Sequence, residues 1–461
     1  MKTDNSSSRI EQDLRRRAAA LAPGAALPSV RALMRDMGVG PATVQRALRQ
    51  LAREGVLESF PGRGTFVAAP PALATGGDTL WQTLALGPAR TGAADLLALS
   101  ELPPAGAFPL HAGYLPPELR ATSLLDVAAA RALRQPGVWD RVPATGSAAL
   151  RRWFAISIGC PEHEVIVCPG TQPALAAAFQ ALAAPASPVL MESPTYLGAL
   201  LAARAAGLVP VPVPTDGDGV RPEPLAAALR ESGARLLYLQ PTHANPTGAS
   251  LAPARRAAVM ELARRHGLFI LEDDWARDFS LAAAPPPLAA DDPHGHVILL
   301  RSLTKCAAPG LRVGALRAKG AAFERLRAAR VAVDFFVPAP LQETALNLLT
   351  APSWPRHLRR LQAALRARRD ALAAALRQTL GEACLDRLPT GGLHLWLRLP
   401  PEADDEAVTR AAARRQVLVS PGRAWFPAEP TEPRLRLSFA AVDPADAPTV
   451  ADRIAEALRE A

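Results

Sequence analysis

The sequence predicts two unlike domains: a small N-terminal helical domain with a two-stranded wing, and a larger α/β domain with a mostly parallel sheet. Three observations support this prediction. A chain of 461 residues is too long for one compact core. Three amphipathic helical patterns and a hairpin pattern fill residues 10–68. From Glu164 onward, short apolar strands alternate with helices.

Composition and charge narrow the class of protein. Hydrophobic residues make up 49% and charged residues 21% of the chain, which is typical of globular proteins. The net charge of +9 is unevenly placed, because residues 1–70 carry 11 Lys and Arg against 6 Asp and Glu. A small basic domain at one end indicates a polyanionic partner, although a solvated charged face would give the same count.

Targeting segments and metal sites are not expected. No apolar run approaches the roughly 20 residues of a membrane span, and residues 1–8 lack the apolar core of a secretory signal. We therefore expect a cytoplasmic protein that does not contact a membrane. The four cysteines form no CxxC pair and have no metal-ligand spacing with histidine, so neither a disulfide framework nor a metal site is predicted.

Three helices are predicted in the N-terminal domain. The first spans about Ile10 to Leu21. Ser29 can cap the second helix, whose apolar residues recur at helical spacing until Gly38 ends it. Pro41 suits the first turn of the third helix, which has one apolar face along its length. The second and third helices, joined by a tight turn, form a helix-turn-helix.

The predicted wing consists of two strands, Val56–Phe60 and Thr65–Val67, around a glycine-rich tip that carries Arg63. In such a domain the second helix of the pair enters the major groove of DNA, so its polar side chains are candidates for base and phosphate contact. A helical bundle with solvated arginines is the simpler alternative. The predicted DNA-contacting residues are Arg31, Thr43, Gln45, Arg46, Arg49 and Arg63.

Composition also predicts the domain boundaries. Residues 1–69 form the DNA-binding domain, and residues 70–106, rich in Ala, Pro and Gly, form a linker of irregular chain. Residues 107–461 form the α/β domain, with a larger part to about residue 330 and a smaller α+β part over 331–461. Such a linker would allow the small domain to move or to pack on a neighbouring subunit.

Six apolar strands separated by helical stretches predict a largely parallel sheet covered on both faces. These strands are Glu164–Val167, Val189–Glu192, Val209–Val213, Leu236–Gln240, Leu268–Glu272 and Val297–Arg301. The stretches Gly391–Leu397 and Leu435–Phe439 predict strands of the smaller part. In an open parallel sheet the ligand site lies at the carboxyl ends of the strands, so the polar residues there are the candidates for it.

The polar residues after three of these strands suit one ligand. Gly170–Gln172 begin a helix, where free backbone N–H groups and the helix dipole favour a phosphate. Ser302 and Arg312 could hold that phosphate, which leaves Lys305 free to form a Schiff base with an aldehyde. A buried Asp273 could pair with a protonated pyridine nitrogen. Each residue alone has a simpler explanation, but their joint occurrence indicates a single site.

Residues 10–68 resemble the winged helix of GntR-type bacterial regulators, through the stretches Leu27–Arg31 and Gly62–Val67. The sequence departs from that family at Pro41, where the family usually has a DNA-contacting arginine. The resemblance implies that the remaining arginines bind double-stranded DNA. Because the arginine is missing at Pro41, the operator sequence is not expected to be the one familiar from that family.

From about Leu110 to the C-terminus the chain resembles the fold-type I aminotransferases, whose fold is that of the α/β pyridoxal-phosphate-dependent transferases. The resemblance implies that Lys305 is the Schiff-base lysine of pyridoxal 5'-phosphate, with Ser302 and Arg312 on its phosphate and Asp273 on its ring nitrogen. The implied cofactor-binding residues are Gly170, Thr171, Gln172, Tyr196, Asn245, Asp273, Trp275, Ser302, Lys305 and Arg312.

The same resemblance assigns three further roles. Tyr196 stacks on the cofactor ring, Asn245 contacts the ring hydroxyl, and Arg436 clamps the α-carboxylate of a substrate or effector as a bidentate pair. Trp275 is a departure, because the family generally has a tyrosine there, and an indole N–H can donate but cannot accept. Before Gly146 the family usually has a tyrosine that reaches the partner subunit's phosphate; here Arg141 is a candidate replacement.

A GntR-like winged helix joined to an aminotransferase-like domain is the arrangement of the MocR family of regulators, which the chain resembles over almost its full length. The resemblance implies a homodimeric transcription regulator whose larger domain senses pyridoxal phosphate or an amino compound. One alternative is a working aminotransferase with a DNA-binding domain, which Lys305, Asp273 and Arg436 would permit. Another is a regulator that has lost the cofactor, which the intact lysine and phosphate residues disfavour. Trp275 and the winged helix favour sensing over turnover.

Overall fold

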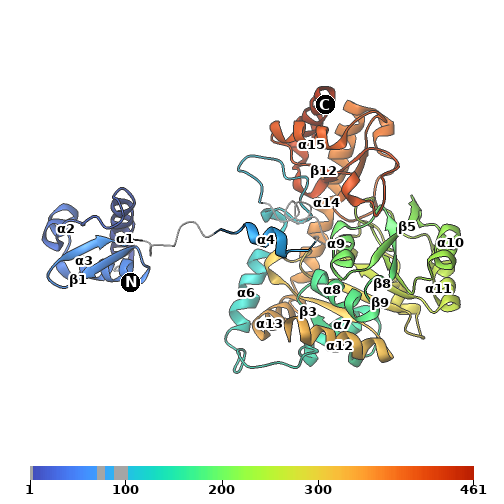
Figure 1. Cartoon of the computed structure of the whole chain (residues 1–461), viewed down its shortest axis with the longest axis horizontal. Helices are drawn as coiled ribbons and strands as arrows, with labels where there is room; N and C mark the ends of the chain where they lie inside the picture. The colour runs from blue at the N-terminus through green and yellow to red at the C-terminus, as the bar shows by residue number, and fades with distance from the viewer. Residues whose placement is uncertain (1–3, 70–77, 88–101) are drawn as a thin grey trace. The chain divides into compact units, whose positions relative to one another are not determined.

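Two compact units make up the chain in the computed structural model, Met1–Pro88 and Ala89–Ala461 (Figure 1). The residues described are 4–69, 78–87 and 102–461. Most of the predicted linker, residues 70–106, therefore lies outside the described residues. Its described part contains the short helix α4 (Leu80–Ala85), where irregular chain was expected.

The N-terminal unit has the three helices and the wing that the sequence predicts. Its elements are α1 (Asp4–Ala19), α2 (Val30–Met37), α3 (Pro41–Arg53), β1 (Leu57–Phe60) and β2 (Gly64–Val67). Ser29 Oγ accepts a hydrogen bond from the backbone N–H of Ala32, and Gly38 ends α2 in the left-handed conformation with φ 63°. Helix α1 begins before the expected Ile10, because no proline or glycine interrupts the chain there.

A separate core holds the N-terminal unit together. Helices α1 and α3 pack against each other, and the two strands pair antiparallel with Leu57 opposite Val67. The fully buried side chains are Leu14, Leu33, Val44, Ala47 and Leu51. These residues lie on the helix faces that the apolar spacing predicts.

An eight-stranded, mostly parallel sheet forms the centre of the second unit, in the order β3-β10-β9-β8-β7-β4-β5-β6. The strands are β3 (Val165–Cys168), β4 (Pro188–Ser193), β5 (Val209–Asp216), β6 (Gly219–Val220), β7 (Leu236–Leu239), β8 (Phe269–Asp274), β9 (Val297–Ser302) and β10 (Gly314–Arg317). The six predicted strands are all present. The sequence did not predict β6 and β10, which run antiparallel to their neighbours, because both are short and carry few β-branched or aromatic residues.

Helices cover both faces of this sheet, as a largely parallel sheet requires. In β3, Ile166 and Cys168 pack in one apolar cluster, and Val165 and Val167 pack in the other, since alternate strand residues point to opposite faces. The first cluster contains α8 (Thr171–Leu182), α9 (Leu197–Ala205) and α12 (Gly320–Asp334). The second contains α6 (Thr122–Ala132), α7 (Ala148–Ile158), α10 (Pro222–Ser232), α11 (Pro253–His266) and α13 (Ala339–Leu349).

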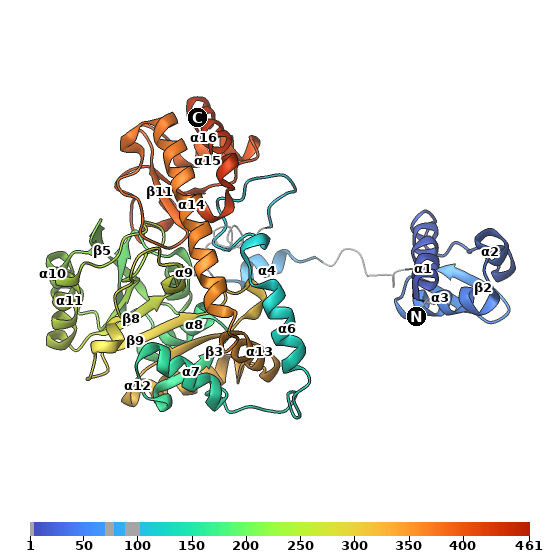
Figure 2. The ribbon, with the colours of Figure 1, turned by 180° about the vertical axis from the view of Figure 1, so that it is seen from behind.

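The smaller part of this unit follows the long helix α14 (Trp354–Leu380), which runs from the sheet layer into it (Figure 2). Its antiparallel sheet has the order β11-β13-β12. Its elements are β11 (His394–Arg398), α15 (Asp405–Arg414), β12 (Ser420–Pro421), β13 (Arg434–Ser438) and α16 (Ala447–Glu460). The expected start near residue 331 falls inside α12, and α13 still packs on α6 and α7 of the larger part.

Two absences hold for the residues that the structure describes. None of their helices is long and apolar enough to cross a membrane. No group of His, Cys, Asp and Glu among them could hold a metal ion.

Candidate functional site

A cavity of about 110 Å³ lies where the carboxyl ends of the parallel strands meet the smaller part. Polar residues that follow different strands converge in this cavity, as expected at the carboxyl ends of the strands in an open parallel sheet. Seven of the predicted residues line it: Thr171, Tyr196, Asn245, Asp273, Trp275, Lys305 and Arg436. The other four predicted residues, Gly170, Gln172, Ser302 and Arg312, are not among the residues that line the cavity.

Lys305 extends into this cavity from the loop after β9. Its Nζ donates a hydrogen bond to the backbone oxygen of Gly113 at 2.8 Å and lies 3.6 Å from the centroid of the Tyr114 ring. Burial, together with the charges of Arg436 and Arg312, lowers the pKa of Lys305 to about 7. Near neutral pH much of the amine is therefore uncharged and nucleophilic.

Arg312 lies against the start of α8. Its Nη2 donates to the backbone oxygen of Pro169 at 2.8 Å. A Cβ on Gly170 would lie only 3.0 Å from that nitrogen, and Gly170 has a positive φ of 95°, so the position suits only glycine. The arginine and the free N–H groups of the first turn of α8, which begins at Thr171, together favour an anion.

Two predicted phosphate-end side chains make local contacts. Ser302 Oγ accepts a hydrogen bond from the backbone N–H of Thr304 at 3.1 Å and stays buried at the end of β9. Gln172 donates to the backbone oxygen of Gly198 at 2.7 Å. The side chain of Gln172 thus joins α8 to α9.

Asp273, near the end of β8, is fully enclosed. Its Oδ2 accepts hydrogen bonds from the Tyr238 hydroxyl at 2.7 Å and from the Gln240 amide at 2.9 Å. Its Oδ1 is buried and has no hydrogen-bond partner in the described part of the chain. Burial raises the pKa of Asp273 to about 6, and the two hydrogen bonds oppose that rise. At neutral pH the carboxylate is mostly ionised, with one buried oxygen free to accept.

Several other polar groups that line the cavity, among them those of Asn245 and Trp275, have no hydrogen-bond partner among the described residues. Asn245 donates its backbone N–H to Gln240 Oε1 at 2.8 Å, while its side-chain Oδ1 is buried and unpaired. The indole N–H of Trp275 is also buried and unpaired. The Trp275 ring stacks on His394 with centroids 5.6 Å apart. The donor predicted for Trp275 is therefore present and unused.

Arg436 enters the cavity from β13 of the smaller part. Its guanidinium lies 4.3 Å from the centroid of the Trp425 ring and donates to the backbone oxygen of His111. Burial lowers its pKa to about 9, which still leaves it charged at neutral pH. The pKa of the neighbouring His394 falls well below its usual range because of burial and the charges of Arg436 and Lys305. His394 is therefore a neutral imidazole.

Tyr196 folds back over the first turn of α9. A Cβ on Gly198 would lie 2.4 Å from Tyr196 Cζ, so glycine is required beneath the ring. Burial raises the pKa of the Tyr196 hydroxyl well above its usual value, and the phenol stays protonated. Its ring forms one wall of the cavity.

Sequence reasoning missed several residues of the cavity. Gln240 directly follows β7, so the strand-end rule could have found it. His394 is the first residue of β11. The alternation of side chains along this strand could have placed His394 beside the site only if the position of the strand in its sheet were already known. Gly113 and Tyr114 lie in irregular chain ahead of the short helix η1 (Pro117–Leu119), and no sequence signal distinguishes them.

The predicted DNA-contacting residues lie in the N-terminal unit. Five of them, Arg31, Gln45, Arg46, Arg49 and Arg63, are exposed, and Thr43 is half-buried. Thr43, Gln45, Arg46 and Arg49 are on α3, and Arg63 at the wing tip lies 5.5 Å from the Phe60 ring centroid. The exposed side of α3 is thus available to a groove.

Fold and site together define a pyridoxal-phosphate-type transferase unit preceded by a winged helix. Residues 119–454 match the family "Aminotransferase class I and II", and residues 6–67 match the family "Bacterial regulatory proteins, gntR family". The chain belongs to the class I and II aminotransferase family and, through its added winged helix, to the MocR group of GntR-type regulators.

Relatives of both kinds are similar to this chain. It is 32% identical to a 2-aminoadipate transaminase of Thermus thermophilus, over 76% of this chain and 89% of that protein. It is 30% identical to the HTH-type transcriptional regulator TauR of Rhodobacter capsulatus, over 95% and 93% of the two chains. The YjiR regulator of Escherichia coli is 29% identical over 90% of this chain and 88% of its own.

A solved structure gives the same result for the larger unit. The α-aminoadipate aminotransferase LysN of Thermus thermophilus, complexed with N-(5'-phosphopyridoxyl)-L-leucine, aligns with a TM-score of 0.75 and 30% identity. The alignment covers 80% of this chain and 96% of LysN. The cofactor of the larger unit is pyridoxal phosphate.

The residues present fit this cofactor. The unpaired buried oxygen of Asp273 suits a protonated ring nitrogen, and the unpaired groups of Asn245 and Trp275 suit polar ring substituents. The Gly170 backbone leaves room beside Arg312 for an anion. A lysine with a lowered pKa suits covalent attachment to an aldehyde.

Proposed function

We propose that this protein is a DNA-binding transcription regulator whose larger unit holds pyridoxal phosphate on Lys305 and responds to that cofactor or to an amino compound. One observation carries the proposal. The same chain has an exposed helix-turn-helix and, in its other unit, a cavity where the Lys305 amine lies near a buried, charged Arg436.

The proposed roles of the site residues follow from their chemistry. The phosphate is held at the start of α8 and by the loop after β9, through Gly170, Thr171, Gln172, Ser302 and Arg312. Tyr196 would lie against the cofactor ring, Asp273 would hold its nitrogen, and Asn245 and Trp275 would contact its oxygen. An ionised Asp273 keeps the ring nitrogen protonated, and the bound cofactor then supplies an electron-withdrawing aldehyde.

Lys305 and Arg436 have separate roles in the recognition of an amino compound. With the cofactor bound, the uncharged Lys305 amine would be the group that holds its aldehyde covalently. The Arg436 guanidinium would bind the carboxylate of an incoming amino compound. The neutral His394 adds no charge to the cavity, so the guanidinium remains the attraction for the carboxylate.

Release of Lys305 gives the site two states. The free Lys305 amine donates to the backbone oxygen of Gly113 and lies over the Tyr114 ring, whereas an amine attached to the cofactor would be held by that group instead. Gly113 and Tyr114 belong to the chain that leads from the linker into the larger unit. We infer that ligand exchange changes the conformation of this segment and so alters the placement of the winged helix.

The proposed assembly is a homodimer on an operator with two half-sites. Sites of this fold form between subunits, and a twofold pair of winged helices matches a palindromic DNA site. Because Pro41 replaces the usual arginine at the start of α3, the half-site sequence is expected to differ from that of other GntR-type regulators.

The covalent attachment can be tested with a matched control, because the chain has three lysines, Lys2, Lys305 and Lys319. Protein loaded with pyridoxal phosphate should show a visible absorption band. Lys305→Ala should abolish the band, and Lys319→Ala, whose amine lies by the Asp292 backbone oxygen at 3.2 Å, should keep it. An unchanged band in Lys305→Ala would remove this lysine from the mechanism.

A catalytically active aminotransferase is the second candidate, favoured by the similarity to a transaminase and by the same three residues, Lys305, Asp273 and Arg436. Titrating the loaded protein with a panel of amino acids distinguishes the two functions. A sensor should change its spectrum and its DNA affinity without producing keto acid. Accumulation of keto acid over many turnovers would establish the enzyme instead.

A further inference from the structure

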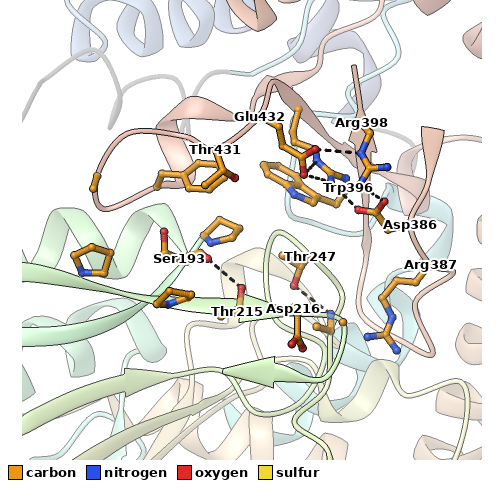
Figure 3. Close-up of a pocket in the computed structure, with 18 of the residues that line it drawn as sticks. Ser193, Thr215, Asp216, Thr247, Asp386, Arg387, Trp396, Arg398, Thr431 and Glu432 are labelled. Carbon is orange, nitrogen blue, oxygen red and sulfur yellow. Dashed lines mark hydrogen bonds and ion pairs between the residues drawn. The ribbon is translucent and has the colours of Figure 1, made fainter. Parts of the chain in front are cut away.

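A second cavity, of about 560 Å³, lies beside the cofactor cavity in the larger unit (Figure 3). It opens between the ends of β4 and β5 and the three-stranded sheet of the smaller part. Its volume falls in the range of small-molecule sites, roughly 300–1,000 Å³. None of the roles proposed above uses it.

The two cavities share the walls of the smaller part. On β11, His394 lines the cofactor cavity and Trp396 lines the second one. On β13, Arg436 lines the cofactor cavity and Arg434 lines the second one. Residues two apart on a strand point to the same face, so one sheet face covers both cavities side by side.

The walls of the larger part are shared in the same way. Pro194 lines the second cavity and Tyr196, two residues later, lines the cofactor cavity. Asn245 lines the cofactor cavity and Thr247 lines the second one. A molecule that separates or draws together these walls therefore also moves the groups around Lys305 relative to one another.

The second cavity has surfaces suited to a flat ring. Trp396 and Phe426 form an aromatic pair with centroids 6.3 Å apart. Pro212 and Pro214 of β5 line the cavity from the larger part. Figure 3 shows the Trp396 indole above Thr215 and Thr247, with open space between them. Planar aromatic molecules stack on such surfaces.

The charged groups of this cavity are mostly neutralised. Asp386 pairs with Arg398 at 2.6 Å and with Arg434 at 2.7 Å, and Glu432 contacts the same two arginines. Glu429 and Arg387 are different, since neither has an ion pair among the described residues. A Cβ on Gly217 would lie 3.0 Å from Arg387 Nη1, so the Arg387 guanidinium reaches across to the β5–β6 turn.

We propose that this cavity is a regulatory ligand site for a planar aromatic molecule with one carboxylate, which stacks on Trp396 and pairs with Arg387. Occupation of the site changes the affinity of the cofactor cavity for amino compounds, and this coupling rests on the proposed function. Four carboxylates line the cavity against three guanidiniums, which disfavours a nucleotide or another polyanion. The partner of Arg387 is a single negative charge.

Indole-3-acetate is a suitable probe, because it has a flat ring and one carboxylate and lacks an amine that could react with the cofactor. Calorimetry on the full-length, cofactor-loaded protein should show saturable binding at one site per chain. Arg387→Ala should weaken it about tenfold or more, as expected when a charge-assisted hydrogen bond is removed. Trp396→Leu should also weaken it, whereas Arg325→Ala, an exposed arginine on α12, should leave it unchanged.

Several outcomes would overturn this site. Absence of saturable binding, or equal affinity in Arg387→Ala, would reject it. Loss of binding in Arg436→Lys but not in Arg387→Ala would place the probe in the cofactor cavity instead. Adenosine monophosphate bound more tightly than indole-3-acetate would refute the ligand class.

The coupling has its own measurement. Saturating indole-3-acetate should shift the amino-acid titration of the cofactor spectrum, and amino acid should shift the indole-3-acetate affinity by the same factor. Unchanged titrations in both directions would reject the coupling. Failure of the Lys305→Ala test would reject the proposed function and leave the calorimetric result on the second cavity intact.

Discussion

The side-chain amide of Gln240 donates a hydrogen bond to Asp273 Oδ2 across 2.9 Å and leaves Oδ1 of that carboxylate as its unpaired oxygen. The same side chain accepts from the backbone N–H of Asn245 at 2.8 Å. One glutamine therefore orients both the acid proposed for the ring nitrogen and the loop that carries the amide proposed for the ring oxygen. Gln240 is a positioning residue.

Gln240→Leu should weaken cofactor binding about tenfold or more, because it leaves the Asn245 N–H unpaired and removes a hydrogen bond that lowers the pKa of Asp273. Spectral titration of protein freed of cofactor would measure the dissociation constant. Gln362→Leu, which removes a 3.2 Å bond to the backbone oxygen of Asp278, is the matched control and should bind normally. Equal affinities in the two variants would contradict this role.

Attachment of the cofactor should depend on pH through Lys305. The pKa of this amine is lowered to about 7, so its reactive uncharged form accumulates as the pH rises through 7. The rate of the absorbance change on adding pyridoxal phosphate should therefore rise to a plateau with its midpoint near pH 7. A midpoint about three pH units higher, as for an ordinary lysine, would refute the interpretation.

Two variants should move that midpoint in opposite directions. Arg436→Met removes a positive charge that lowers the pKa of Lys305, so the midpoint should rise. Asp273→Asn removes a negative charge that raises it, so the midpoint should fall. Opposite shifts of the midpoint would indicate electrostatic control of Lys305. A general loss of structure would instead shift the midpoint of both variants in the same direction.

Ligand sites in open parallel sheets lie at the carboxyl ends of the strands, and this rule decides how much of the site the sequence could predict. Lys305 follows β9 and Asp273 lies near the end of β8, both strands with clear apolar patterns, so their convergence was foreseeable, whereas Asn245 was predicted only through the family resemblance. The contact of Arg312 with Gly170 was not foreseeable, because it depends on β10, an antiparallel strand with a weak pattern. The register pairs Gly314 with Cys168, and two residues beyond each of them lie Arg312 and Gly170.

Fold class and the winged helix were also predictable, since caps such as Ser29 and the apolar spacing of α3 are local signals. Gly113 and Tyr114 were not. Gly113 accepts from Lys305 across 192 positions of sequence, and both residues lie in irregular chain, which carries no period. Contacts of this kind depend on tertiary packing alone.

Gly113→Ala should weaken binding of amino compounds and leave cofactor attachment intact. Its Cβ would lie 3.6 Å from Lys305 Nζ and 3.9 Å from both Arg436 Nη1 and His394 Cε1, in ordinary contact with each. The methyl group would thus fill the point where the amine and carboxylate groups converge, without displacing the chain. Spectral titration with amino acids measures the change, and unchanged affinity together with an unchanged cofactor band would place the effector elsewhere.

DNA binding by the N-terminal unit should be electrostatic and centred on α3. Arg46 and Arg49 are exposed on this helix, so replacing either with alanine should reduce operator affinity. Each phosphate that the variant no longer neutralises should also lower the slope of log affinity against log salt by about 0.9. Fluorescence anisotropy at several salt concentrations measures both quantities.

The matched control for these variants is Arg16→Ala on α1, whose guanidinium pairs with Asp13 at 3.2 Å. Because this arginine lies outside the helix-turn-helix and already has an acidic partner, the control should retain both the affinity and the salt slope of the unchanged protein. If Arg46→Ala and Arg49→Ala both bind like the control, another surface of the unit contacts the DNA and α3 is not the recognition helix.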